Sequence, residues 1–371
     1  MATGDSRTEE ECFLEDHCFT RFREHTIPHR DDFERAKAIC QSCKRDVITI
    51  ETPRLEDVKE PGGCIYMSAS KSRLVVKVTP KFGIRGAKST VLKLRTIDGS
   101  KHRNNSKVLY KEQLITMYVQ KCEENIIRKD KTKKRDRLFA ACQPSWFKFL
   151  RCEGFELEYF PEGSLNKLPS SQLHDNERLG LLRDAASGLQ FLNSLGIMHF
   201  DVKPSNICVS MRADGTRIGK LIDLGAAKFV GERVDRCRTL DDTPEYRPPE
   251  LFPNSHVGLA GYHEDLDNWQ LVKPSADSWR LGMCVVEVMT RRRFPIVWET
   301  ASDSDPYFKQ FIDLNHAVGF NKPLTFPGLC TSSLHPVAEM LMHHLLRLCE
   351  EYRWDMKKVV REINGHLSLC Q

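Results

Sequence analysis

The sequence lacks an apolar run long enough to cross a membrane. No stretch approaches the roughly 20 apolar residues that a membrane-spanning helix needs. The amino terminus, MATGDSRTEEECFLEDHC, also lacks a basic start followed by an apolar run, so it does not predict a secretory signal. We therefore expect no membrane partner and an intracellular protein, with the cytoplasm as its compartment.

A strong excess of one charge is also missing. The chain has 56 Lys and Arg against 51 Asp and Glu, a net charge of +5. This balance permits phosphate ligands but does not by itself predict binding to nucleic acid. The basic run RKDKTKKRDR (128–137) could be a nuclear address, a phosphate patch or a solvated loop between elements. Because of this run, the nucleus is the alternative compartment. Nucleic acid is the weakest of the partner hypotheses.

Cysteine, in contrast, is plentiful. Without a secretory signal, the 14 cysteines are expected to be free thiols in a reducing compartment. Cys40 and Cys43 have the C-x-x-C spacing of a zinc knuckle, and Cys12, His17 and Cys18 could add ligands. The spacing does not repeat as paired knuckles do. A helical extension with free cysteines is therefore the alternative for residues 1–50.

The length and composition predict a folded chain of more than one domain. Its 371 residues are 40% hydrophobic and 29% charged, which argues against a wholly disordered protein. Strands are predicted within 54–79, where GGCIYMSAS and RLVVKVT are rich in β-branched and apolar residues. Residues 80–107 are basic and polar without clear periodicity, which predicts a solvated insertion. A strand that leaves one domain for another is predicted at FELEYFPEGSL (155–165).

Two helices are predicted from their apolar spacing. The first has Tyr110, Leu114, Met117 and Tyr118 on one face. The second ends near Gly196, a residue suited to a helix C-terminus. Its apolar stripe consists of Leu179, Leu182, Ala186, Leu189 and Leu192.

A β-hairpin is predicted where NICVS and IGKLID flank the turn dipeptide Asp214-Gly215. Such a hairpin brings Asn206 close to Asp223, near Asp201 and Lys203. A carboxylate and an amide oxygen are ligands that Mg²⁺ takes together with the oxygens of a substrate phosphate. The pattern therefore predicts phosphoryl transfer.

Several motifs in chain order resemble those of the eukaryotic-type protein kinases, over roughly residues 55–365. HFDVKPSN (199–206) resembles the catalytic loop H-R-D-x-K-x-x-N, and DLG (223–225) resembles D-F-G. TPEYRPPE (243–250) resembles the end of an activation segment, and DSWRLG (277–282) resembles the helix start D-x-W-x-x-G. The upstream matches are VVK (75–77) to the third-strand lysine motif, Glu112 to the helix C glutamate, ENIIR (124–128) to the stretch after that helix, and EYFPEGSL (158–165) to the hinge.

The resemblance implies an α+β, bilobal protein-kinase-like fold. Residues 1–50 form an extension, 51–158 a small, mainly β lobe with one key helix, and 159–371 a larger, mainly α lobe. Residues 80–107 are the basic insertion of the small lobe. The implied activity is a serine/threonine protein kinase with ATP and Mg²⁺ or Mn²⁺ as cofactors and a protein as substrate.

The resemblance also implies roles for individual residues. Asp201 is the expected catalytic base, Lys203 contacts the transferred phosphoryl group, and Asn206 and Asp223 hold the metal. Lys77, in an ion pair with Glu112, holds the α- and β-phosphates. The other expected ATP-binding residues are Gly63, Ile65 and Val75, the gatekeeper Leu157, Glu158 and Phe160 of the hinge, and Cys208 below the adenine.

Three further expectations concern the large lobe. Thr239 and Thr243 belong to the activation segment, and Thr243 reaches Asp201 and Lys203. Glu250 and Arg353 form a buried structural ion pair, because a buried charge must find a partner. His199 is expected to pack under the site rather than to act as an acid or base.

The chain departs from the family pattern in two informative places. The glycine-rich loop is poor: DVKEPGGCIY keeps Gly63, but Val58 and Glu60 stand where the first two glycines are expected. Phe200 replaces the arginine of H-R-D, which in the family commonly pairs with a phosphorylated residue of the activation segment. We therefore predict activity without obligatory phosphorylation at Thr239.

The poor glycine-rich loop supports an alternative from another class, a pseudokinase that serves as a binding or scaffold module. The residues expected to touch metal or phosphate are nevertheless retained. Each of them taken singly also has a structural explanation, such as a turn-forming Asp223 or a surface Glu112. Their occurrence together and in order favours the active kinase.

Overall fold

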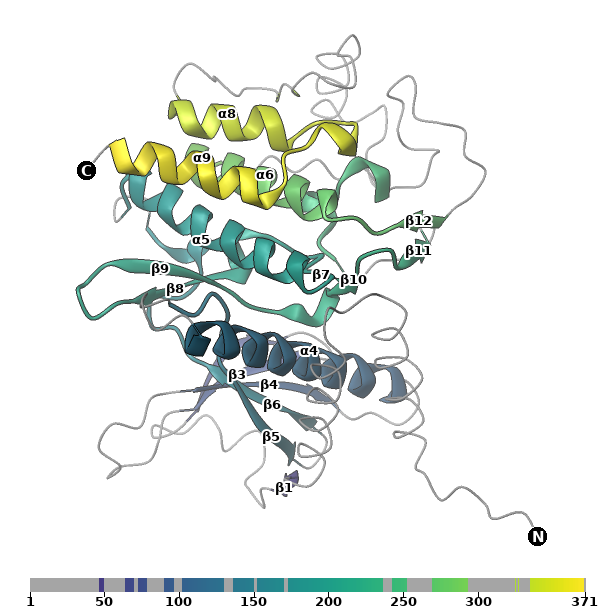
Figure 1. The fold of residues 1–371 in the computed structure, drawn as a ribbon. Helices are drawn as coiled ribbons and strands as arrows, with labels where there is room; N and C mark the ends of the chain where they lie inside the picture. The colour runs from purple at the N-terminus through teal and green to yellow at the C-terminus, as the bar shows by residue number, and fades with distance from the viewer. Residues whose placement is uncertain are drawn as a thin grey trace. The chain divides into compact units, whose positions relative to one another are not determined.

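The structure, a computed structural model, describes the chain in segments: 47–49, 64–69, 73–78, 90–96, 102–129, 136–149, 152–169, 173–235, 242–251, 269–292, 324, 326 and 334–369. Helices and strands are mixed, as expected for the α+β class (Figure 1). The chain divides into two compact units between Tyr159 and Phe160. This division lies one residue from the expected lobe boundary.

The first unit contains a six-stranded sheet with the order β1-β5-β6-β4-β3-β2. Strand β1 pairs parallel with β5, and the other neighbours are antiparallel. Strands β2 and β3 confirm the strands predicted within 54–79. The strands are β1 (Val47–Thr49), β2 (Cys64–Ala69), β3 (Arg73–Val78), β4 (Thr90–Thr96), β5 (Cys142–Phe149) and β6 (Cys152–Glu158).

Helix α4 (His102–Lys129) packs against β4, β5 and β6 of this sheet. Leu114 and Tyr118, two members of the predicted apolar face, are buried, and Met117 packs against a cluster formed by Leu109, Cys142 and Phe155. The side chain of Tyr110, the fourth member, lies outside the described residues. The predicted helix is confirmed, and its buried face joins it to the sheet.

Two sequence predictions in this unit are wrong. Residues 80–107 are not one solvated insertion, because 90–96 form β4 and 102–107 begin α4. ENIIR (124–128) does not follow the helix but lies within its last turns. The strand was concealed by Lys93, a buried charged residue in its middle, and the first turn of the helix has no acidic residue to mark its start.

The second unit is mainly helical. Helix α5 (Asp175–Ser194) packs against α9 (Met356–Leu369), α6 (Ser275–Thr290) and the β8–β9 hairpin, and α6 packs against α8 (Pro336–Leu345) (Figure 1). None of the helices in the described segments is long and apolar enough to cross a bilayer. The short strands are β7 (Ile197–Met198), β8 (Ile207–Met211), β9 (Arg217–Leu221), β10 (Lys228–Phe229), β11 (Arg233–Asp235) and β12 (Trp269–Leu271).

Both predicted turns of the second unit have the backbone conformations that their glycines permit. Helix α5 ends at the C-cap Leu195, and Gly196 follows with a φ of 69°. Strands β8 and β9 pair antiparallel around Gly215, whose φ is 83°. The helix and the hairpin that enclose the catalytic-loop sequence are therefore confirmed.

We expect Gly282→Ala to destabilise the second unit, because this glycine lies where α6 meets the end of α8. A Cβ at Gly282 would lie 2.7 Å from Leu346 Cδ2 and 2.9 Å from Leu345 Cβ. Such overpacking costs about 1–3 kcal/mol. Gly180→Ala in α5 is the matched control, since a Cβ there meets nothing within 4 Å and alanine favours helix. Urea denaturation should show a lower midpoint for the first variant only; equal midpoints would contradict the packing.

Candidate active site

A buried carboxylate fixes the backbone of the catalytic loop, which lies between β7 and β8, through two hydrogen bonds. Asp277, in the first turn of α6, accepts the backbone N–H of His199 at 2.8 Å and that of Phe200 at 2.9 Å. Asp277 has no exposed surface. Asp277 is the first residue of the D-x-W-x-x-G motif, but nothing in the local sequence predicts this role for it.

A second set of bonds joins the catalytic loop to the end of the hairpin. His199 is buried, and its Nε2 donates to the carbonyl oxygen of Ile222 at 3.0 Å. The N–H of Ile222 in turn donates to the carbonyl oxygen of Asn206 at 3.0 Å. These bonds place Asp223, the next residue, beside Asn206, as the hairpin predicted. His199 thus has the structural position expected for it.

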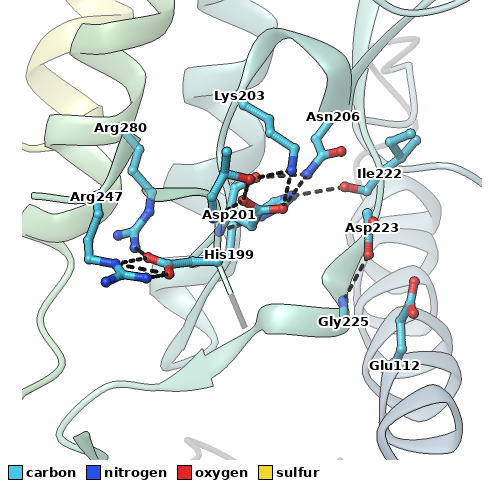
Figure 2. A network of polar contacts seen from close by, with 12 residues as sticks. Glu112, His199, Asp201, Lys203, Asn206, Ile222, Asp223, Gly225, Arg247 and Arg280 are labelled. Carbon is cyan, nitrogen blue, oxygen red and sulfur yellow. Dashed lines mark hydrogen bonds and ion pairs between the residues drawn. The ribbon is translucent and has the colours of Figure 1, made fainter. Parts of the chain in front are cut away.

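The carboxylate of Asp201 is the centre of a polar network (Figure 2). Its Oδ2 accepts bonds from Lys203 Nζ at 2.7 Å and from Asn206 Nδ2 at 3.1 Å. Its Oδ1 accepts the backbone N–H of Thr243 at 3.0 Å and the Thr243 hydroxyl at 2.6 Å. Lys203 also donates to the hydroxyl of Thr243. The predicted contact of Thr243 with both residues is present, and it joins the activation segment to the catalytic loop.

Asn206 and Asp223 fit the requirements of a magnesium ion. The amide nitrogen of Asn206 donates to the carbonyl oxygen of Asp201 at 2.8 Å, so its amide oxygen faces away from that residue. Asp223 has a φ of 65°, and its Oδ1 accepts the N–H of Gly225 at 3.3 Å. One carboxylate and one amide oxygen are hard ligands, and Mg²⁺ takes its others from water and phosphate.

No group of three or more His, Cys, Asp or Glu in the described segments could hold a metal ion by itself. The candidate zinc ligands of residues 1–50 lie outside the described residues.

The first unit contains a buried ion pair between β4 and α4. Lys93 Nζ lies 2.5 Å from Glu112 Oε1, and the two side chains are 8% and 1% exposed. The predicted helix glutamate Glu112 thus has a lysine beside it, but the lysine seen there is Lys93. The pairing of Glu112 with Lys77 stays a prediction. Lys77 lies in β3, where it pairs with Val91, and its side chain is outside the described residues.

A buried cluster of one carboxylate and two guanidinium groups lies next to the Asp201 network (Figure 2). Asp242 accepts from Arg247 Nη2 and from Arg280 Nη2, each at 2.6 Å. Burial favours the neutral carboxyl, but the two arginines outweigh it and lower the pKa of Asp242 below its ordinary value of 3.8. The ionised carboxylate thus stabilises the fold above that ordinary pKa, and this contribution is lost as the pH falls through the lower pKa of the folded state.

Glu250 and Arg353 form the predicted structural pair. Two bonds join the guanidinium to the carboxylate, Nη1 to Oε1 at 2.7 Å and Nη2 to Oε2 at 2.8 Å. Both residues are buried. This bidentate pairing satisfies two buried charges, each of which would destabilise the fold without its partner.

The structure describes the positions of only some of the remaining predicted ATP-binding residues. Leu157 and Glu158 end β6, Phe160 is buried at the start of the second unit, and Cys208 is buried in β8. Ile65 and Val75 lie in β2 and β3, with side chains outside the described residues. Gly63, the rest of the glycine-rich loop and Thr239 lie outside them as well. Their roles stay predictions.

The catalytic-loop network, the D-L-G turn and the lysine–glutamate pair are together the features of a protein kinase domain. A sequence model of that family, described as "Protein kinase domain", matches residues 101–363, more than half of the chain. The chain belongs to the protein kinase family. The matched region begins after Lys93.

Curated relatives are similar over smaller parts. A zebrafish (Danio rerio) protein named "Inhibitor of nuclear factor kappa-B kinase subunit alpha" is 28% identical over 54% of this chain and 25% of its own length. "Mitogen-activated protein kinase kinase 7" of Arabidopsis thaliana is 28% identical over 40% of this chain and 46% of its own. "Serine/threonine-protein kinase STE20" of Saccharomyces cerevisiae is 29% identical over 36% and 12%. The matches thus span less than half of each of these relatives.

Proposed function

We propose that the chain is a serine/threonine protein kinase that transfers the γ-phosphoryl group of ATP to hydroxyl groups of a protein substrate. The observation that carries the proposal is the network in which Lys203 and Thr243 both contact the Asp201 carboxylate. A carboxylate, an ammonium group and nearby metal-binding oxygens are the parts that phosphoryl transfer requires. The names of the relatives, one of them a serine/threonine kinase, support the same substrate class.

Four residues of the second unit have distinct tasks in this proposal. Asp201 orients the substrate hydroxyl and accepts its proton, as a general base within hydrogen-bond reach does. Lys203 stabilises the negative charge of the transferred group. Asn206 and Asp223 hold Mg²⁺ or Mn²⁺, which supplies charge neutralisation on the phosphates when bound.

In the first unit, Lys93 takes the phosphate-binding role that was first expected of Lys77. Its buried pair with Glu112 fixes the ammonium group in one position. A fixed positive charge in a poorly hydrated place binds phosphate oxygens without the cost of ordering a flexible side chain.

Incubation of the chain with Mg²⁺ and γ-labelled ATP, using generic basic and acidic proteins as acceptors, tests the proposal. We expect label on serine and threonine and none on tyrosine, read by phosphoamino-acid analysis. Nucleotide binding is measured separately, as a thermal shift on addition of Mg²⁺ and ATP. No transfer to any acceptor would contradict the proposal and favour the scaffold alternative, and label on tyrosine would contradict the substrate class.

A further inference from the structure

We propose that Asp242 is a positioning residue that holds the activation segment in its active arrangement without a phosphate group. This inference rests on the proposed kinase function and adds a means of regulation to it. In the family that the motifs resemble, the arginine of H-R-D commonly binds a phosphorylated residue of the activation segment. Here Phe200 stands in that place, so the segment needs another anchor.

The anchor is visible in the contacts of Asp242. Its Oδ1 accepts from Arg247 Nε at 3.0 Å and Nη2 at 2.6 Å, and its Oδ2 accepts from Arg280 Nη2 at 2.6 Å. The side chains of Asp242 and Arg280 have no exposed surface, and that of Arg247 is 1% exposed. Charge-assisted bonds shielded from water are strong and little weakened by salt.

Arg280 also lies beside Phe200, the residue that replaces the arginine of H-R-D. Its guanidinium carbon lies 4.4 Å from the centre of the Phe200 ring, within the range of a cation–π contact. Phe200 is fully buried with Met198, Leu251 and Ala276. Helix α6 therefore supplies, from a different part of the chain, a guanidinium group beside the residue that replaces the usual one.

The same helix holds both parts of the active site. Through Asp277 it fixes the backbone of the catalytic loop at His199 and Phe200. Three residues later, through Arg280, it fixes Asp242, the residue immediately before Thr243. Since Thr243 bonds to Asp201 through its N–H and its hydroxyl, the position of Asp242 determines whether these bonds can form.

The expected result has two parts. Protein produced with a phosphatase, and shown by intact mass to carry no phosphate, keeps its kcat within about twofold, and so does Thr239→Ala. Asp242→Asn lowers kcat by about 10- to 100-fold, because a misplaced active-site group costs up to about 10²-fold. The KM for ATP stays within about threefold, since this change leaves the nucleotide-binding groups in place.

Asp184→Asn is the matched control for a purely structural effect. Asp184 is also buried and bonded to an arginine, Arg183, but its other partner is the N–H of Gly219 in β9. We expect this variant to melt at a lower temperature and to keep its kcat when assayed well below that temperature. Equal losses of kcat in Asp184→Asn and Asp242→Asn would reduce Asp242 to a structural role and overturn the proposal.

A readout that needs no catalysis separates this inference from the kinase assignment. Amide hydrogen exchange, followed by mass spectrometry, reports on the N–H of Thr243 in the peptide that contains it. We expect faster exchange there in Asp242→Asn and no change there in Asp184→Asn, even if no substrate is found. Unchanged exchange in Asp242→Asn, or activity that requires phosphate on the wild-type chain, would overturn the proposal.

Discussion

Asp201→Asn is expected to lower kcat by about 10²- to 10⁴-fold, the usual contribution of a general base. Asparagine cannot take the proton of a substrate hydroxyl, and its NH₂ group cannot accept the bonds that Asp201 receives from Lys203 and Thr243. The measurement is steady-state transfer from labelled ATP to a protein acceptor, with nucleotide binding followed as a thermal shift. We expect binding to persist while transfer is lost.

Asp214→Asn serves as the control for this variant. Asp214 lies in the exposed turn of the β8–β9 hairpin and bonds only locally, to Thr216. Asparagine forms the same kind of turn, so neither folding nor transfer should change. Transfer that persists in Asp201→Asn at the wild-type rate would show that the measured transfer does not depend on Asp201, as expected of a contaminating kinase, and would contradict the assignment of that activity to this site.

Lys93→Met is expected to cause the second large loss, of about 10²- to 10³-fold in kcat/KM for ATP. This is the range seen when one preorganised group that stabilises developing charge is removed. The matched variant is Lys77→Met, which also removes one lysine from a neighbouring strand of the same sheet. Only Lys93→Met should lose activity; the opposite result would restore Lys77 to the role first assigned to it.

Loss of folding could imitate this result, because Lys93→Met leaves the buried carboxylate of Glu112 without the ammonium group seen beside it. Breaking a buried pair from one side costs about 3–5 kcal/mol. The double variant Lys93→Met, Glu112→Gln removes both charges and should recover most of the stability. If it also recovered the activity, the loss in the single variant would be one of folding, and Lys93 would have no role in binding ATP.

The catalytic loop could be predicted because its signals are local. His199, Asp201, Lys203 and Asn206 lie within one short stretch, and a turn dipeptide predicts the hairpin that brings Asp223 to them. Here the order of residues along the chain largely determines their arrangement in space. The structure places these five residues as the sequence predicted.

The lysine could not be chosen in the same way. Val75-Val76-Lys77 and Val91-Leu92-Lys93 are nearly the same motif in adjacent, antiparallel strands. The packing of α4 against β4 singles out Lys93, because it brings Glu112 to that residue. A buried lysine in mid-strand also interrupts the apolar pattern, so the sequence predicts an insertion where the structure has β4.

Asp242, Arg280 and Asp277 were missed for a related reason. Each acts on a residue far away in the sequence: Asp242 and Arg280, for example, are 38 positions apart. A carboxylate in an activation segment is expected to be exposed and hydrated. Its burial between two guanidinium groups depends on where α6 lies, which no local pattern specifies.

The side chain of Asp242 is part of the polypeptide from the moment it is synthesised, whereas a regulatory phosphate is attached later and can be removed. If Asp242 anchors the segment as proposed, the segment is complete once the chain has folded, and kinase activity is proportional to the number of molecules present. Control in the cell would then fall on synthesis, degradation and access to substrate. A change in the amount of the protein should accordingly produce a proportional change in phosphorylated product, without the delay and threshold that an upstream kinase introduces.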